Sequence, residues 1–216
     1  SRAYDIFIDY TAGVPALEAV IWTNDTTRAT ALATQNSVYV QTSDTDSLYV
    51  CTIYIDAGGG AVTDSFALRH VWNYYNRVPS LMRVQESTNS WTVTGNTYAQ
   101  ARSSTANQLD FVIGVAESGL SATVMAYATG DTAGDRFSVA IGLDSTTTPA
   151  TGQINNSSSL GTDGNELLAV TAHLDTYPAV GRHTAVWLEQ GSATTEFFGD
   201  NGLTATTTGI SGWSER

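Results

Sequence analysis

The stretch Tyr4-Asp5-Ile6-Phe7-Ile8-Asp9-Tyr10, near the start of the chain, decides the fold class. Its even-numbered positions are all apolar or aromatic, and two of the positions between them are aspartates. Successive side chains of a β-strand point to opposite sides, so this alternation is typical of a strand. The stretch therefore predicts a strand with one apolar face and with Asp5 and Asp9 on the other face.

The same alternation recurs along the chain, between short clusters of Gly, Asn, Ser and Asp. This arrangement is typical of antiparallel all-β proteins. It predicts a β-sandwich, jelly-roll-like in its connections, with a smaller β region at the N-terminus. The expected strands are residues 4–10, 18–23, 37–42, 48–56, 81–85, 90–93, 109–115, 122–128, 137–143, 167–174, 183–188, 194–198 and 207–210.

Composition shifts divide the chain into three parts. An N-terminal β region, residues 1–60, ends at Gly58-Gly59-Gly60, where three glycines favour a flexible turn. A connector, residues 61–79, is helical or irregular, with residues 64–76 as the one candidate helix. A β-sandwich domain follows at residues 80–216, and its longest polar stretch, residues 145–164, is the clearest loop.

The charge is strongly one-sided. The chain has no lysine, nine arginines and 21 acidic residues, which give a net charge of -12. Such a surface repels phosphate backbones and anionic lipid headgroups, so we expect neither nucleic acid nor membrane as a partner. The N-terminus has no apolar signal segment, so we expect folding in a cytoplasm. The single cysteine, Cys51, forms no internal disulfide and is expected to be a small buried hydrophobe.

Catalytic motifs are missing from the sequence. It contains no Gly-x-Ser-x-Gly, Walker, Gly-x-Gly-x-x-Gly or His-Glu-x-x-His pattern. The strand-borne glutamates Glu86, Glu117 and Glu189 could still form the carboxyl pair of a glycosidase, although none lies in a recognisable motif. We therefore expect a protein that is not an enzyme and needs no cofactor.

Two patterns could hold a metal ion. His173 and Asp175 share one face of an expected strand, and His183 could complete a site from a neighbouring strand. Asp44-Thr45-Asp46 and Asp163-Gly164-Asn165-Glu166 resemble fragments of calcium loops. Neither fragment supplies the alternating oxygens that calcium needs, and polar strand ends explain the histidines, so we expect no metal site.

Aromatic residues are concentrated in the middle of the chain. These side chains could stack on sugar rings, or they could fill the sandwich core and the seams between subunits, and we favour core or seam. The concentration comprises Trp72, Tyr74, Tyr75, Trp91 and Tyr98.

One run of sequence resembles a known group of proteins. Val71-Trp72-Asn73-Tyr74-Tyr75-Asn76-Arg77-Val78, followed by Asn89-Ser90-Trp91-Thr92 and Ala106-Asn107-Gln108, is similar to tailed-bacteriophage virion proteins. Further stretches look like the same group, at Trp22-Thr23-Asn24-Asp25 upstream and Gly181-Arg182-His183 downstream. The resemblance spans most of the chain and carries no catalytic role.

The resemblance implies a structural protein of the virion. The chain shows no repetitive shaft of a tail fibre, which favours a capsid decoration (cement) protein that binds the outer head surface as a homotrimer. Its partners would be the major capsid protein or other virion proteins. We expect the contact residues to be Trp72, Tyr74, Tyr75 and Arg77, because Trp, Tyr and Arg lead interface hot spots.

The alternative is a receptor-binding domain of a tail fibre or tail tip that recognises host surface glycans. It predicts that the loop at residues 145–164 lies at an exposed end with aromatic side chains nearby. A free-standing carbohydrate-binding module is a third possibility.

Overall fold

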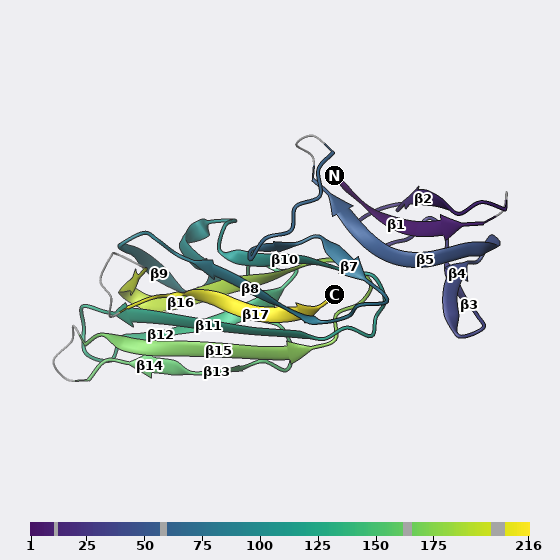
Figure 1. Cartoon of the computed structure of the whole chain (residues 1–216). Coiled ribbons are helices and arrows are strands. Elements are labelled where there is room, and N and C mark those ends of the chain that lie inside the picture. The colour runs from purple at the N-terminus through teal and green to yellow at the C-terminus, as the bar shows by residue number, and fades with distance from the viewer. Residues whose placement is uncertain (11–12, 57–59, 162–165, 200–205) are drawn as a thin grey trace.

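Two β-structured parts lie end to end, a small N-terminal sheet and a larger two-layer sandwich (Figure 1). This computed structural model describes residues 1–10, 13–56, 60–161, 166–199 and 206–216. Across these residues the regular elements are strands, apart from one 3-10 turn, η1 (Ala101–Ser103). The all-β prediction is confirmed, while Gly58 and Gly59 of the expected glycine turn lie outside the described residues.

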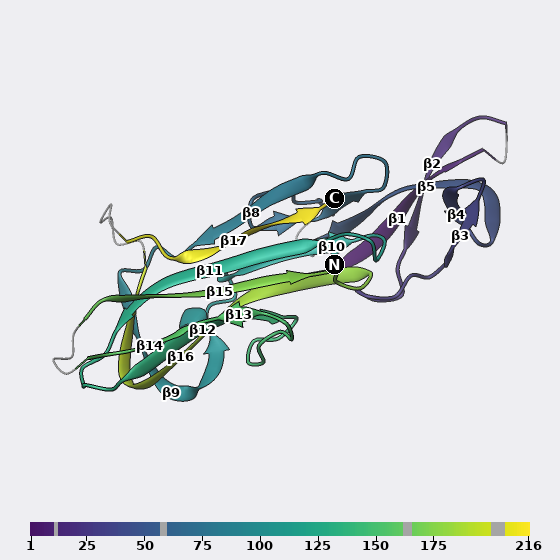
Figure 2. The same cartoon turned by 90° about the horizontal axis from the view of Figure 1, so that it is seen from below.

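The sandwich has the strand order of a jelly roll. Its front layer runs β8-β17-β11-β15, so that the first strand of the sandwich lies beside the last. Its back layer runs β9-β16-β12-β14, and Figure 2 shows the two layers from below. The predicted jelly-roll-like sandwich is therefore confirmed. The strands are β8 (Pro79–Gln85), β9 (Ser90–Gln100), β11 (Leu120–Thr129), β12 (Arg136–Leu143), β14 (Ser157–Ser159), β15 (Leu168–Thr176), β16 (Gly181–Phe198) and β17 (Gly209–Glu215).

One long strand replaces two expected ones. Residues 183–188 and 194–198 both belong to β16, which pairs first with β10 (Gln108–Ile113) and then with β9. The register shifts on either side of Gly191, where an added Cβ would overlap the Thr195 side chain. Glycine therefore lets the strand bend and continue where the sequence pattern suggests a break.

The small sheet has the order β2-β1-β5-β4-β3, and β7 also pairs with β5. β6 pairs in parallel with β10 of the sandwich, so the short strands between residues 61 and 79 join both parts. The strands are β1 (Arg2–Asp9), β2 (Ala16–Ile21), β3 (Leu32–Gln35), β4 (Val38–Gln41), β5 (Asp44–Ile55), β6 (Leu68–Arg69) and β7 (Val71–Asn73).

The expected helix at residues 64–76 does not form. This segment holds β6 and β7, which pair with β10 and β5, and its local bridge between Asp64 and Arg69 is antiparallel and not helical. The spacing of Leu68, Val71, Trp72 and Tyr75 by three, one and three positions would suit a helical stripe, so local pattern does not explain the outcome. Trp72 alone is buried in β7, between half-buried neighbours, as in a strand. The pairing with strands distant in sequence decides the conformation.

The buried face of β1 is the opposite of the apolar face that its alternation suggests. Ala3, Asp5 and Phe7 are buried, whereas Ile6 is half-buried and Ile8 is exposed. The reason is a buried partner for the aspartate, because Arg28 Nε donates to Asp5 Oδ2 at 2.7 Å. A paired carboxylate can occupy a core position that an unpaired one cannot.

The polar stretch at residues 145–164 is more ordered than a plain loop. It contains β14 and β13 (Ile154–Asn155), which pair with β12 and β15. Gln153 Oε1 accepts from Ile141 N at 2.8 Å, and Asn155 Nδ2 donates to the Tyr98 hydroxyl at 3.1 Å. Residues 162–164 lie outside the described part. The segment thus closes the edge between the two layers.

Candidate functional site

Trp72 lies in the core where the small sheet meets the sandwich. Its side chain is 0% exposed, and its Nε1 donates to Ser118 Oγ at 2.9 Å. An added Cβ on Gly114 would overlap both the Trp72 ring and the Tyr49 hydroxyl, so the rings lie directly on the glycine backbone. The expectation that Trp72 contacts a partner is therefore wrong, because it has no surface to offer.

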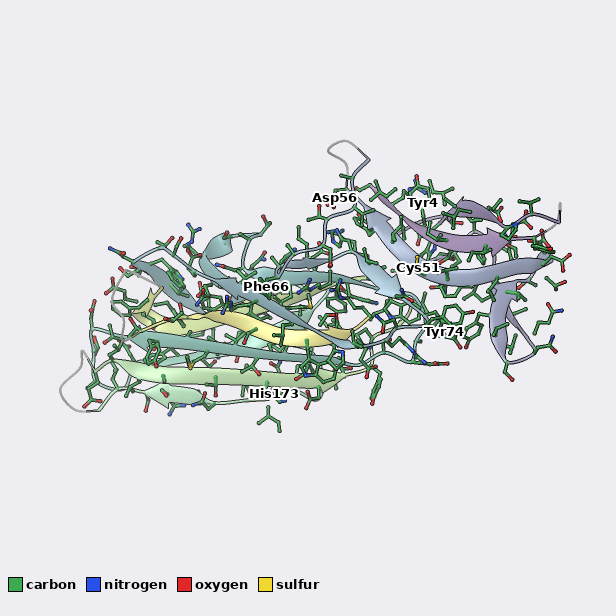
Figure 3. All side chains as sticks on the ribbon, in the orientation of Figure 1. Tyr4, Cys51, Asp56, Phe66, Tyr74 and His173 are labelled. Carbon is green, nitrogen blue, oxygen red and sulfur yellow. The ribbon has the colours of Figure 1, made fainter. Side chains whose placement is uncertain are left out.

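The other expected contact residues reach the surface beside it. Arg77 Nη1 pairs with Glu117 Oε2 at 3.0 Å, and its guanidinium lies 5.4 Å from the Tyr74 ring centre. The Tyr39 hydroxyl donates to Glu117 Oε1 at 3.2 Å, and Tyr75, 54% exposed, packs against Tyr74. We call Tyr39, Tyr74, Tyr75, Arg77 and Glu117 the junction cluster (Figure 3 labels Tyr74).

Sequence reasoning found three members of the junction cluster and missed two. Tyr39 is 78 residues from the Glu117 that it bonds, so no local pattern connects them. Burial and then the Glu117 charge raise the pKa of Tyr39. The phenol therefore stays protonated and remains a donor to the carboxylate.

The outer face of the small sheet is apolar and open. Ile8 faces Leu17 across the β1-β2 pair, and Tyr4 faces Ile21. Leu17 is 79% exposed on the edge strand β2. Cys51 opposes Ile6 on this face, and burial followed by the charge of Asp5 raises the pKa of its thiol to about 11. The thiol is therefore protonated near neutral pH and acts as a small apolar side chain.

Two of the three glutamates that were expected on strands come together, although only Glu189 lies in a strand. Arg102 links them, because its backbone N–H donates to Glu189 Oε1 at 2.7 Å and its Nε donates to Glu86 Oε2 at 2.8 Å. Trp91 Nε1 lies 2.9 Å and 3.0 Å from the two oxygens of Glu189. Glu117, the third, belongs to the junction cluster.

The environments of these two carboxyls push their pKa values apart. Burial raises the pKa of Glu189 to about 7, despite the hydrogen bonds from Arg102 and Trp91 that oppose this. Burial also acts on Glu86, but donors from Asn107, Thr88 and Arg102 outweigh it and lower its pKa to about 2. Such a split is common at catalytic sites.

The geometry nevertheless suits a structural role for the pair. A cavity of about 300 Å³ is lined by Glu189, Trp91 and Arg102, among others, whereas Glu86 lies outside its lining. Glu86 is held by Arg102, Asn107 and the Thr88 backbone N–H, so its oxygens are engaged. A glycosidase needs both carboxyls facing one substrate. This arrangement instead ties the η1 turn to β16.

The histidines of the candidate metal pattern are not brought together. His173 Nε2 lies 2.9 Å from Asp175 Oδ2 on the outer face of β15 (Figure 3). His183 lies in the back layer, with Nδ1 at 2.7 Å from Asp144 Oδ2. Among the described residues no group of three or more His, Cys, Asp and Glu is placed to hold a metal ion. Of the second calcium-like fragment, residues 163–165 lie outside the described part.

No protein-family model matches the chain. No curated protein matches it either. Within the residues described, none of the helical structure has the length and apolar character needed to cross a bilayer.

Proposed function

We propose that this protein is a non-enzymatic structural component of a bacteriophage virion. It binds the outer surface of the assembled head as a homotrimer and acts as a decoration, or cement, protein. The observation that carries the proposal is the open apolar face of the small sheet, which stands apart from the body of the sandwich (Figure 1). The resemblance of residues 71–78 to phage virion proteins is the reason for proposing a bacteriophage particle.

The small sheet is the attachment surface in this proposal. Ile8, Leu17 and Ile21 are all exposed on one face, although isolated domains usually bury such residues. Burying one such aliphatic side chain against a partner contributes about 1.5–3 kcal/mol. Many copies that bridge neighbouring capsid subunits would add this gain at every attachment point.

The junction cluster adds specificity at the edge of that surface. Tyr75 and Arg77 are the residue types that dominate interface hot spots, and both reach the surface. Arg77 is already oriented by Glu117 and Tyr74, so little of its side-chain freedom is lost when a partner binds.

The location is tested by immunogold electron microscopy of purified virions with an antibody against this protein. We expect label distributed over the head. Label confined to the tail would refute the decoration role and favour a fibre component, and particles without label would refute a place in the virion.

The attachment surface is tested by cosedimentation of the purified protein with heads that lack it. Leu17→Asp places a charge on the small sheet, and Leu81→Asp places the same charge on another highly exposed leucine, in the sandwich, 66% exposed. We expect Leu17→Asp to weaken head binding at least tenfold and Leu81→Asp to leave it unchanged. Equal binding by the two variants would remove the small sheet from the contact. Light scattering of the free protein measures the trimer directly, as three chains of 22.9 kDa.

A further inference from the structure

The outer face of the front layer carries rows in which apolar, aromatic and polar side chains lie next to each other. Trp213 of β17 lies between Leu81 of β8 and Ser121 of β11 in the strand register. In the next row Ser211 lies between Arg83 and Thr123. Figure 2 shows β8, β17 and β11 side by side, so these residues share one continuous surface.

A groove follows β17 along this surface. A cavity of about 520 Å³ is lined by Phe66, Leu81 and Trp213 at one end. A second cavity of about 200 Å³ continues past Met125 and Thr208. The two share Arg83, Thr123 and Ser211, so they form one trough. Its floor is hollow because β17 carries only small residues at 209, 211 and 212. The combined size falls in the range of sites for small ligands.

The aromatic wall of the groove packs against the chain at Gly119. A Cβ added to Gly119 would lie 3.5 Å from two ring carbons of Trp213 and 3.8 Å from the Tyr177 ring. The indole therefore packs edgewise against the chain at Gly119 while Leu81 and Phe66 leave the groove side open. A flat ring at the rim of a polar trough is suited to the apolar face of a sugar.

The polar groups of the groove have unused hydrogen-bonding capacity. The Arg83 guanidinium lies over the Phe66 ring at 5.6 Å and forms no ion pair with any residue in the described part of the chain, whereas Arg69, over the same ring, pairs with Asp64. The Thr208 hydroxyl is buried, with 1% of the residue exposed, and likewise has no hydrogen-bond partner among the described residues. This hydroxyl is enclosed, so Arg83 is the donor that a ligand in the groove can reach.

A hydrogen-bonded chain orients the opposite wall. His173 Nδ1 lies 2.9 Å from Thr123 Oγ1, and His173 Nε2 lies 2.9 Å from Asp175 Oδ2. The carboxylate holds the ring nitrogen that it faces as a donor, which leaves Nδ1 to accept from the Thr123 hydroxyl. The threonine oxygen can then accept from a ligand. Placement on strands keeps these groups in fixed positions.

We propose that this groove binds an oligosaccharide. A pyranose ring stacks on Trp213, and its hydroxyls bond to Arg83, Ser211 and Thr123. A sugar matches both the aromatic rim and the hydroxyl-lined trough, whereas a nucleic acid is disfavoured by the net charge of -12. The site lies on the sandwich and is independent of the attachment surface on the small sheet. The glycan contact thus occurs on β17 and its neighbours and not on residues 145–164.

The test is an array of bacterial O-antigen and capsular polysaccharides probed with the intact protein, followed by titration calorimetry with the polysaccharide that binds best. We expect at least one polysaccharide to bind the wild type. Trp213→Ala should weaken binding at least tenfold. Trp213→Phe, which keeps an aromatic ring, should weaken binding less than Trp213→Ala does. Arg83→Gln, at an exposed position with no ion pair to the described residues, should weaken binding severalfold without affecting folding.

Matched controls separate this site from the proposed attachment to heads. Leu17→Asp should leave glycan binding intact while weakening head binding. Leu81→Asp should weaken glycan binding while leaving head binding intact. A blank array for the wild type, or unchanged binding by both Trp213→Ala and Arg83→Gln, would overturn the proposal. So would a loss of trimer mass in light scattering of Leu81→Asp, because the groove would then be covered by a second copy of the chain.

Discussion

Replacing Glu189 by Gln should change how stability depends on pH. Glu189 is almost completely buried, and its pKa is raised from 4.5 to about 7 in the folded protein. Between these two values the folded state binds more protons than the unfolded state. The free energy of unfolding must therefore fall as pH rises from about 4.5 to about 7.

The size of this effect follows from the shift. One pKa unit corresponds to about 1.4 kcal/mol, so the full shift costs roughly 3 kcal/mol above pH 7. Glutamine is isosteric with the protonated acid and cannot ionise. Its amide oxygen can replace Oε1, which accepts from Arg102 N at 2.7 Å and Trp91 Nε1 at 2.9 Å. We expect Glu189→Gln to match the wild type near pH 4.5 and to be more stable, by up to roughly 3 kcal/mol, at pH 8.

The assay is urea unfolding followed by tryptophan fluorescence at intervals from pH 4.5 to 8.5. Another contribution comes from His183, because burial lowers its pKa but the bonds to Asp144 and to the Ala179 carbonyl outweigh burial and raise the pKa above its ordinary value. Its contribution is present below pH 6.5 and is lost as pH rises through the folded pKa. The difference between wild type and Glu189→Gln cancels that contribution. A difference that stays constant across the pH range would refute the reasoning.

Three further predictions concern the junction between the two parts. Arg28→Met leaves Asp5 buried without its partner and should lower the free energy of unfolding by about 3–5 kcal/mol, measured by urea titration at pH 7; a loss below 1 kcal/mol would contradict the buried pair. Gly114→Ala should cost about 1–3 kcal/mol, seen as a lower Tm in calorimetry, because its Cβ overlaps the Trp72 ring. Tyr75→Ala should change stability by no more than about 0.5 kcal/mol, because its side chain is exposed, yet weaken head binding in cosedimentation; normal binding would exclude it from the contact.

Strand existence was predictable because it depends on local alternation. The expected strand at residues 122–128 lies within β11, and that at 137–143 lies within β12. The alternation reports the period of a segment but not which of its faces will be buried. β1 illustrates this limit, since Arg28 makes the aspartate side of the strand the buried side.

The candidate sites were less predictable than the fold. Residues 71–78 were correctly singled out as unusual, but Trp72 serves the core while Tyr75 reaches the surface. The Trp213 groove was missed, because its members come from β8, β11 and β17 and no spacing in the sequence joins them. The only local sign was a tryptophan beside small residues in β17.

The sequence by itself determined the secondary-structure class, the acidic character and the strand-rich sandwich, since each depends on composition or on a period of two residues. Tertiary structure alone decided that residues 64–76 hold β6 and β7 instead of a helix, that Glu86 and Glu189 meet through Arg102, and that the outer face of β17 is hollow. Each of these results depends on backbone pairing or side-chain contact between residues far apart in the chain. Such contacts outweigh local preference, because buried hydrogen-bonding groups and charges must find partners wherever the fold brings them.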